Sequence, residues 1–215
     1  FVVTYAATGY NTTNFTFNAN STSEINYTAS LVKSGLIIYY YDEASCASTC
    51  RAIYASWSVT NGTSTNNSYS TYPSTYANLS YLALPIGTDT FTFNNTLNGT
   101  YYPRQYIVSV ASSLAQTLNV YLLNTTSFTI AATYCAVNTG NTGISGASFT
   151  FGRLIGSSYI TVAQGTAGSD GCYAVYLDSL TTYQAIVSAT GYNTGTFTTQ
   201  PKTLQTVTLT SASAT

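Results

Sequence analysis

Hydrophobic and polar residues alternate along most of this chain with a period of two. The alternating runs are short and rich in Tyr, Thr, Val, Ile and Phe, whereas the nearest helical candidate covers only residues 112–116. Such runs, separated by Gly-, Asn- and Asp-containing turns, are typical of half-buried β-strands. We therefore predict an all-β protein, with strands at residues 2–7, 14–18, 23–32, 35–41, 53–60, 79–84, 88–93, 104–110, 117–123, 127–135, 147–151, 158–163, 171–177, 183–189, 195–199 and 203–210.

The first thirty-one residues repeat a segment near the C-terminus. A shift of 182 positions aligns Ala7 through Thr16 with Ala189 through Thr198, and eight of these ten residues are identical. The later copy follows a full set of predicted strands, whereas the first copy follows none. We interpret residues 1–31 as the closing strands of a β-domain whose other strands this chain does not contain.

A weaker third copy helps to divide the rest of the chain. Residues 106–110 and 118–122 parallel residues 183–187 and 204–209. The chain then holds three closing strand pairs and two opening sets. We predict a leading strand segment at 1–31 and β-domains at 32–126 and 127–215.

A leading segment without its own domain has three possible fates. It can fold back onto its own chain, remain disordered, or complete a sheet in another copy by β-strand addition. Strand addition is a head-to-tail contact, and such a contact builds an open filament if it does not close into a ring.

The chain carries very few charges. Charged residues make up 5% of it, against about 25% in a typical globular domain, and the formal net charge is −1. Nucleic acid and anionic membranes therefore have no basic patch to bind. No run of 18 apolar residues could span a membrane. With no His and six carboxylates, we expect the fold to tolerate acid.

Glycans are the expected source of surface solubility. The acceptor pattern Asn-x-Ser/Thr occurs ten times, always before residue 127. We expect covalent N-glycans on the N-terminal part and a bare C-terminal part, although a chain rich in Asn, Ser and Thr also forms such patterns by chance. The candidate asparagines are Asn11, Asn14, Asn20, Asn26, Asn61, Asn66, Asn78, Asn94, Asn98 and Asn124.

Four cysteines, Cys46, Cys50, Cys135 and Cys172, accompany these acceptor patterns. An even count in this context favours disulfides in an oxidising, extracytoplasmic compartment. Three pairings are possible, and Cys46–Cys50 with Cys135–Cys172 keeps each bridge within one domain. A metal site is the alternative, but the chain has no His and the spacing does not match paired zinc knuckles.

The sequence offers no catalytic constellation, so we predict a protein that is not an enzyme and needs no cofactor or metal. A Ser/His/Asp triad is impossible without His. Asp42 and Glu43 are adjacent at a strand end, so their side chains should point to opposite faces. The run Tyr39–Tyr41 is a candidate contact surface, although tyrosines in strands more often pack against neighbouring strands.

Three runs in the C-terminal domain carry a resemblance to a known family. They are 143–149 (Gly-Ile-Ser-Gly-Ala-Ser-Phe), 168–173 (Gly-Ser-Asp-Gly-Cys-Tyr) and 183–192, which ends in Gly191-Tyr192. Over about 85 residues this domain resembles the carboxypeptidase-regulatory-like, transthyretin-type β-sandwich. The resemblance implies little about function. Together with the strand pattern and the repeats, it leads us to predict two tandem β-sandwich (Ig/transthyretin-like) domains behind an N-terminal donor strand segment.

The whole pattern resembles the subunit of the archaeal thread, a pilus-like surface filament of thermoacidophilic archaea. That family implies donor strand complementation, in which an N-terminal strand fills a groove in a neighbouring subunit, together with heavy N-glycosylation. Here the donor would be Phe1 to about Thr16, with Phe1, Val3, Tyr5 and Ala7 on its buried face. The expected partners are other copies of this chain in an extracellular filament with a role in cell adhesion. The alternative is a fragment of a multi-domain glycosylated surface adhesin or viral spike, acting as a binding module.

Overall fold

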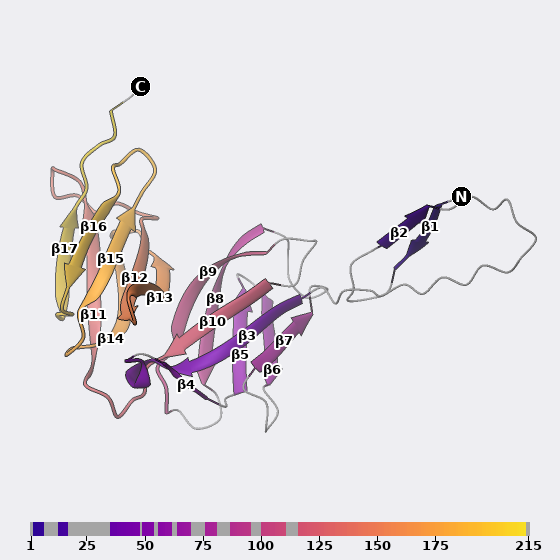
Figure 1. The fold of residues 1–215 in the computed structure, drawn as a ribbon. Coiled ribbons are helices and arrows are strands. Elements are labelled where there is room, and N and C mark those ends of the chain that lie inside the picture. The colour runs from indigo at the N-terminus through magenta and orange to yellow at the C-terminus, as the bar shows by residue number, and fades with distance from the viewer. Residues whose placement is uncertain are drawn as a thin grey trace, which may run out of the picture.

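The computed structural model describes residues 2–6, 13–16, 35–47, 49–53, 56–61, 64–69, 76–80, 87–95, 100–110 and 116–213. These residues form β-strands and one short 3-10 helix, so the prediction of an all-β protein is confirmed. Figure 1 shows two β-sandwiches side by side, and an N-terminal hairpin drawn apart from them. The predicted strand at 23–32 and residues 112–115 of the helical candidate at 112–116 lie outside the described residues, whereas Gln116 begins strand β10.

The N-terminal sandwich consists of two sheets. In the first, β3 pairs with β10 in parallel on one edge and with β7 and the short β4 in antiparallel fashion on the other. In the second, the strand order is β6-β5-β8-β9. The bounds are β3 Gly35–Asp42, β4 Arg51–Ala52, β5 Ser56–Asn61, β6 Ser64–Tyr69, β7 Tyr76–Ser80, β8 Gly87–Asn95, β9 Arg104–Val110 and β10 Gln116–Leu122.

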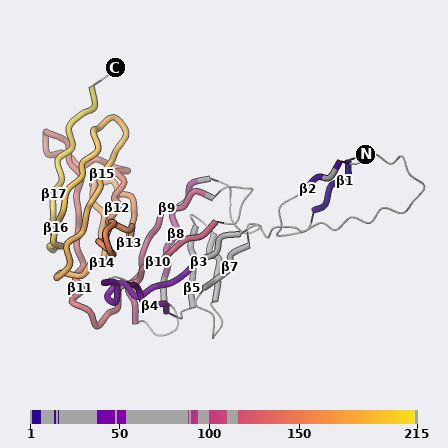
Figure 2. The backbone as a smooth tube through the Cα atoms, in the orientation of Figure 1, coloured from indigo at the N-terminus to yellow at the C-terminus, as the bar shows by residue number. Residues whose placement is uncertain are grey.

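The C-terminal sandwich also consists of two sheets, with strand orders β14-β11-β17 and β13-β12-β15-β16. Figure 2 traces the chain through both of them. Strand β17 pairs with β11 in parallel, and the other pairs are antiparallel. The bounds are β11 Thr129–Val137, β12 Ser148–Ile155, β13 Ser158–Thr166, β14 Cys172–Asp178, β15 Tyr183–Ser188, β16 Gly195–Thr199 and β17 Leu204–Thr208.

The two sandwiches share one topology. With β4 set aside, strands β3 and β5 to β10 take the places of β11 to β17 in chain order. The sheet β7-β3-β10 then corresponds to β14-β11-β17, and β6-β5-β8-β9 corresponds to β13-β12-β15-β16. Each sandwich therefore already has seven strands of its own. In this correspondence β9 is the counterpart of β16. The prediction that residues 106–110 of β9 match residues 183–187 of β15 is therefore wrong by one strand, whereas the match of β10 with β17 is correct.

Aromatic and aliphatic side chains from alternate strand positions fill both cores. In the C-terminal sandwich Phe149, Phe151, Tyr183, Ala185 and Val187 are all fully buried. The period-two burial of β15 illustrates the alternation on which the strand predictions relied. The N-terminal core is built in the same way from Ile38, Tyr40, Ile53, Phe91, Phe93, Tyr106, Val108, Val120 and Leu122.

Two of the glycine-containing runs that carried the family resemblance meet in the structure. A Cβ on Gly143 would lie 2.0 Å from the carbonyl oxygen of Asp170. Gly171 has a φ of 80°, and a Cβ there would lie 2.5 Å from the Ile144 nitrogen. Glycine is required at both positions because the two turns touch through their backbones.

Strand β6 was not predicted. Its sequence, Ser64-Thr-Asn-Asn-Ser-Tyr69, contains almost no apolar residue, so the alternation that reveals a half-buried strand is missing. The predicted domain boundary between residues 126 and 127 falls between β10 and β11.

Candidate functional site

The N-terminal hairpin consists of β1 (Val2–Tyr5) and β2 (Thr13–Thr16), paired antiparallel. Its register reproduces that of β15 and β16. Val2 pairs with Thr16, and the residues 182 positions later, Gln184 and Thr198, also pair. The other three pairs of the hairpin correspond in the same way. The sequence repeat is therefore also a repeat of strand pairing.

The two faces of β1 differ in exposure. Val2 and Thr4 are exposed, with Val2 at 64%, whereas Val3 and Tyr5 are half-buried. Two of the predicted donor residues thus share the less exposed face, while Phe1 and Ala7 lie outside the described residues. The counterparts of Val3 and Tyr5 are Ala185 and Val187, which are fully buried in the C-terminal core.

The hairpin and its counterpart have different neighbours. In the C-terminal sandwich, β15 pairs with β16 on one edge and with β12 on the other. Among the described residues, β1 belongs to a two-stranded sheet with β2. The hairpin therefore carries the core-facing side of a sandwich strand without the sandwich that would cover it.

The structure does not place the glycan acceptors in one group. Asn14 lies exposed on β2, where its Oδ1 accepts a hydrogen bond from Thr4 Oγ1 at 2.8 Å. Asn124 caps the turn after β10 through bonds from Thr126 N and Oγ1 to its Oδ1. Asn61, Asn66, Asn78 and Asn94 lie on strands of the N-terminal sandwich, and Asn11, Asn20, Asn26 and Asn98 lie outside the described residues. Their glycosylation stays a prediction.

Each disulfide joins two cysteines of the same sandwich: Cys46 pairs with Cys50, and Cys135 pairs with Cys172. Cys135 and Cys172 are direct cross-strand partners on β11 and β14. In that sheet β11 is the central strand and β14 is an edge strand. Cys46 and Cys50 close the loop that follows the 3-10 helix η1 (Glu43–Ser45).

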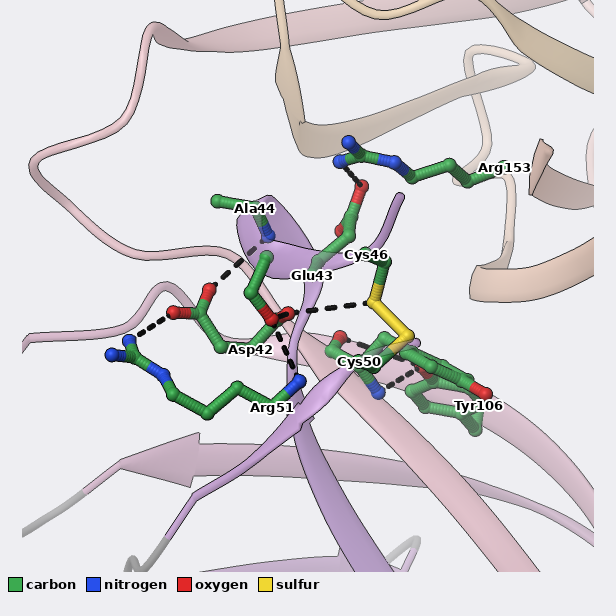
Figure 3. Close-up of a disulfide and its surroundings, with 10 residues drawn as sticks. Asp42, Glu43, Ala44, Cys46, Cys50, Arg51, Tyr106 and Arg153 are labelled. Atoms are coloured by element: carbon green, nitrogen blue, oxygen red, sulfur yellow. Dashed lines mark hydrogen bonds and ion pairs between the residues drawn. A yellow bond between two sulfur atoms is a disulfide. The ribbon is translucent and has the colours of Figure 1, made fainter. Parts of the chain in front are cut away.

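Sequence reasoning missed a buried polar cluster between the two sandwiches. Figure 3 shows one part of it, the Glu43 side chain directed at Arg153 beside the Cys46–Cys50 disulfide. Glu43 of η1 and Arg104 of β9 form an ion pair in which both side chains are fully buried. The same carboxylate accepts a hydrogen bond from Tyr183 Oη at 2.5 Å and lies 3.7 Å from Arg153 Nη1. Tyr183 and Arg153 belong to the C-terminal sandwich, so Glu43 links the two domains.

Further hydrogen bonds cross the same junction. Tyr106 Oη donates to the carbonyl oxygen of Val162 at 2.8 Å, and Ile107 N donates to Gln164 Oε1 at 3.1 Å. Gly156 N, in the turn after β12, donates to Ala47 O in the disulfide-closed loop at 3.3 Å. We call these contacts, together with the Glu43 cluster, the interdomain junction. The Glu43–Arg104 pair and the Tyr106–Val162 bond are buried and directional, so they favour one relative placement of the two sandwiches.

The predicted surface at Tyr39–Tyr41 is not a single exposed patch. Tyr40 is fully buried in the N-terminal core. Tyr41 stacks on Tyr121 with ring centroids 5.3 Å apart, and both pack against the C-terminal core cluster. The run therefore contributes to the fold and to the junction. Asp42 and Glu43 do diverge, since Asp42 pairs with the exposed Arg51 at 2.5 Å.

Burial raises the pKa of three tyrosines at or beside the junction. The pKa of Tyr173 rises to about 12, and burial raises those of Tyr106 and Tyr183 further, with the Glu43 carboxylate adding to the effect at Tyr183. For Arg104, burial has the largest effect and lowers the pKa, but the attraction of Glu43 together with Tyr183, Tyr106 and Tyr173 outweighs it, so the net shift is upward.

These tyrosines predict an alkaline limit to stability. Their folded pKa values lie above the unfolded value near 10, so the folded state holds protons that the unfolded state has lost. Their contribution is complete below pH about 10 and is lost as the pH rises through the folded values. We expect the free energy of unfolding, measured by urea titration, to be constant from pH 6 to 9 and to fall above pH about 10.

Tyr173→Phe is the matched variant for this alkaline loss, because it removes a titrating hydroxyl and keeps the ring. Between pH 10 and 12 its stability should fall less steeply than that of the wild type, by up to about 1.4 kcal/mol per pH unit. Equal slopes for the two proteins would contradict the assignment. The variant also loses the hydrogen bond from Tyr173 Oη to Gln164 O, so the comparison concerns slopes and not absolute values.

A cleft of about 150 Å³ lies between the sandwiches. Its walls are Tyr173, Ala174, Val175 and Tyr176 of β14, and Thr92, Pro103 and Gln105 of the N-terminal sandwich. Beside it, Tyr102 and Tyr176 stack with ring centroids 4.2 Å apart. None of the seven residues that form the cleft walls is charged. Within the described residues no group of three or more His, Cys, Asp or Glu side chains comes together to hold a metal.

No family model matches the chain, and no curated protein matches it. Solved structures show a distant similarity in fold, and several of them are Gram-positive pilins. The Bacillus anthracis TIE protein is 19% identical with a TM-score of 0.34, over 84% of this chain and 35% of that one. This chain thus spans about a third of the TIE protein.

Two pilin structures are similar over more of their own length. The shaft pilin SpaA from Lactobacillus rhamnosus GG is 13% identical with a TM-score of 0.34, over 85% of this chain and 98% of that one. A streptococcal ancillary pilin is 14% identical with a TM-score of 0.34, over 94% and 70%. In the described residues, no helix has the length and apolarity to cross a membrane.

Proposed function

We propose that this chain is the structural subunit of an extracellular surface filament of the archaeal thread type. Subunits polymerise head to tail when the N-terminal strand segment of one copy adds to a sheet of the next. The mature chain would be secreted, N-glycosylated and disulfide-bonded, with no catalytic role and no cofactor. Adhesion to cells or surfaces would be the task of the assembled filament.

One observation carries the proposal. The hairpin β1–β2 reproduces the register of β15–β16, while each sandwich already contains seven strands. The hairpin is therefore additional to both folds, yet it has the alternation of a core strand. An isolated two-stranded hairpin is marginally stable in water, so this segment needs a covering sheet.

The composition supports the same reading. Between residues 127 and 213 the charged residues are Arg153, Asp170, Asp178 and Lys202, and no glycan acceptor occurs. Such a surface carries little charge repulsion and no glycan to keep copies apart. Backbone hydrogen bonds along an added strand give directional association without charges.

Electron microscopy of the purified full chain, with and without residues 1–20, tests this proposal. We expect filaments from the full chain and monomers from the shortened one. Val3→Lys in the full chain should also abolish filaments, because it places a charge on the half-buried face of β1. Thr4→Lys, on the exposed face, is the matched control and should assemble. Filaments from Val3→Lys, or monomers from every chain, would refute strand donation.

A second candidate is the tail of a preceding sandwich in a longer adhesin. In favour of it, Ile25 and Tyr27 align with Val207 and Leu209 of the last strand region, so that residues 1–31 match three consecutive strands. Monomers from both chains in the same experiment would favour this reading.

A further inference from the structure

Strand β14 has an open edge at a defined place. In the part of the chain that the structure describes, it pairs with β11 alone, and Ala136 N donates to Gly171 O at 2.9 Å. Because antiparallel pairs alternate between bonded and non-bonded positions, this bond fixes the phase along the strand. Ala174 and Tyr176 therefore turn their N–H and C=O groups away from β11. Among the described residues, no other group bonds to these backbone atoms.

At both ends of this open stretch, the outward-facing backbone groups of β14 already have hydrogen-bond partners. Cys172 N donates to Asp170 Oδ1 at 2.9 Å, and its carbonyl oxygen accepts from Gly168 N at 3.0 Å. At the other end, Asp178 N donates to Tyr183 Oη at 3.1 Å. The available ladder positions are thus Ala174 and Tyr176, which suits a short strand of about four residues.

This open edge lies in the cleft between the two sandwiches. Residues 173–176 form one wall, and Thr92, Pro103 and Gln105 form the other. A strand placed here would gain backbone bonds from β14 and side-chain packing from the N-terminal sandwich. The edge of β16 is open as well, but β16 is not among the strands that line this cleft.

We propose that β1 of a second copy pairs with β14 in this cleft, so that the cleft is the acceptor site of the filament. This inference rests on the proposed function and names the surface that the donor occupies. β1 has four residues, matching the four residues of β14 that line the cleft. Both partners are uncharged, so neither must bury an ion.

The glycan acceptors decide which strand of the hairpin enters. Asn14 lies on β2, and Asn11 lies in the sequence between the two strands. A glycan on either cannot enter a cleft of this size. β1 contains no acceptor asparagine, and its counterpart β15 is flanked by strands on both edges. β1 therefore enters the cleft, and β2 stays on the outside.

The test uses the full chain with Ala174→Lys. A lysine on an edge strand blocks strand addition because its charge must remain in water. The matched control is Thr198→Lys, an exposed position on the β16 edge of the same sandwich. We expect at least a tenfold loss of filament mass in sedimentation and electron microscopy for Ala174→Lys and none for Thr198→Lys, with both variants folded by circular dichroism.

Hydrogen exchange gives a second, direct readout. The amides of Ala174 and Tyr176 should exchange at least tenfold more slowly in wild-type filaments than in the full-length Val3→Lys monomer. If Ala174→Lys assembles normally and these amides stay unprotected in filaments, the cleft is not the acceptor, although strand donation stands. Filaments from Val3→Lys would instead overturn donation itself. If these amides are also protected in wild-type monomers at every dilution, the strand in the cleft belongs to the hairpin of the same chain, and the proposed pairing with a second copy is wrong.

Discussion

Replacing Glu43 with alanine is expected to destabilise the folded chain by about 3–5 kcal/mol, the cost of removing one partner from a buried ion pair. Among the described residues, Glu43 is the only carboxylate in ion-pair distance of Arg104 and Arg153. The Arg104 side chain is fully buried, and its Nε already lacks a hydrogen-bond acceptor there. Without Glu43 its charge would stay buried and uncompensated.

The Glu43→Ala substitution should also make the two sandwiches unfold independently of each other. Trp57, the single tryptophan, lies on β5 of the N-terminal sandwich, so its fluorescence follows that domain. Circular dichroism follows both domains. In the wild type the two urea transitions should coincide, whereas in Glu43→Ala they should separate. Arg51→Ala is the control: it removes the exposed partner of the buried Asp42, which keeps its hydrogen bond from Ala44 N, so the loss should be smaller and the two transitions should still coincide. Coincident transitions with unchanged stability in Glu43→Ala would show that the junction does not couple the domains.

Gly171→Ala is expected to cost about 3 kcal/mol in the C-terminal sandwich, from backbone strain at positive φ and from overlap with the neighbouring turn. The added Cβ would lie 2.5 Å from Ile144 N and 2.6 Å from Ala136 O, and both are backbone atoms that cannot turn aside. Urea unfolding followed by circular dichroism measures the loss.

Gly146→Ala separates the two contributions to this loss. Gly146 has a φ of 74°, but a Cβ there meets nothing within 4 Å. It should cost about 1 kcal/mol, the strain alone. Equal losses at the two positions would mean that close contact between the turns is unimportant.

The strands were predictable wherever a half-buried face left its alternation in the sequence. β9 and β16 were predicted with their observed bounds, and β15 to within one residue. The prediction missed β6 because its sequence has almost no apolar residue to mark a buried face. The hairpin register followed from the repeat, since residues that align at one offset keep the same cross-strand partners.

The junction could not be predicted from the sequence. Glu43, Arg104, Arg153 and Tyr183 are up to 140 positions apart, and no local pattern connects them. Their signal was the rarity of charge, because a chain with five basic residues that buries one of them must have a specific partner for it. That argument identifies candidates but not pairs. The cleft was equally hidden, since it arises from how two separately predicted sandwiches meet.

The parallel pairing of the first and last strand in each sandwich has a mechanical consequence. β3 lies beside β10 and β11 beside β17, so the chain enters each domain at one end of a strand pair and leaves at the opposite end. A pull on the two termini of either domain then shears the whole ladder, loading its hydrogen bonds together and not one after another. The resistance of each domain to tension would then reside in these two ladders.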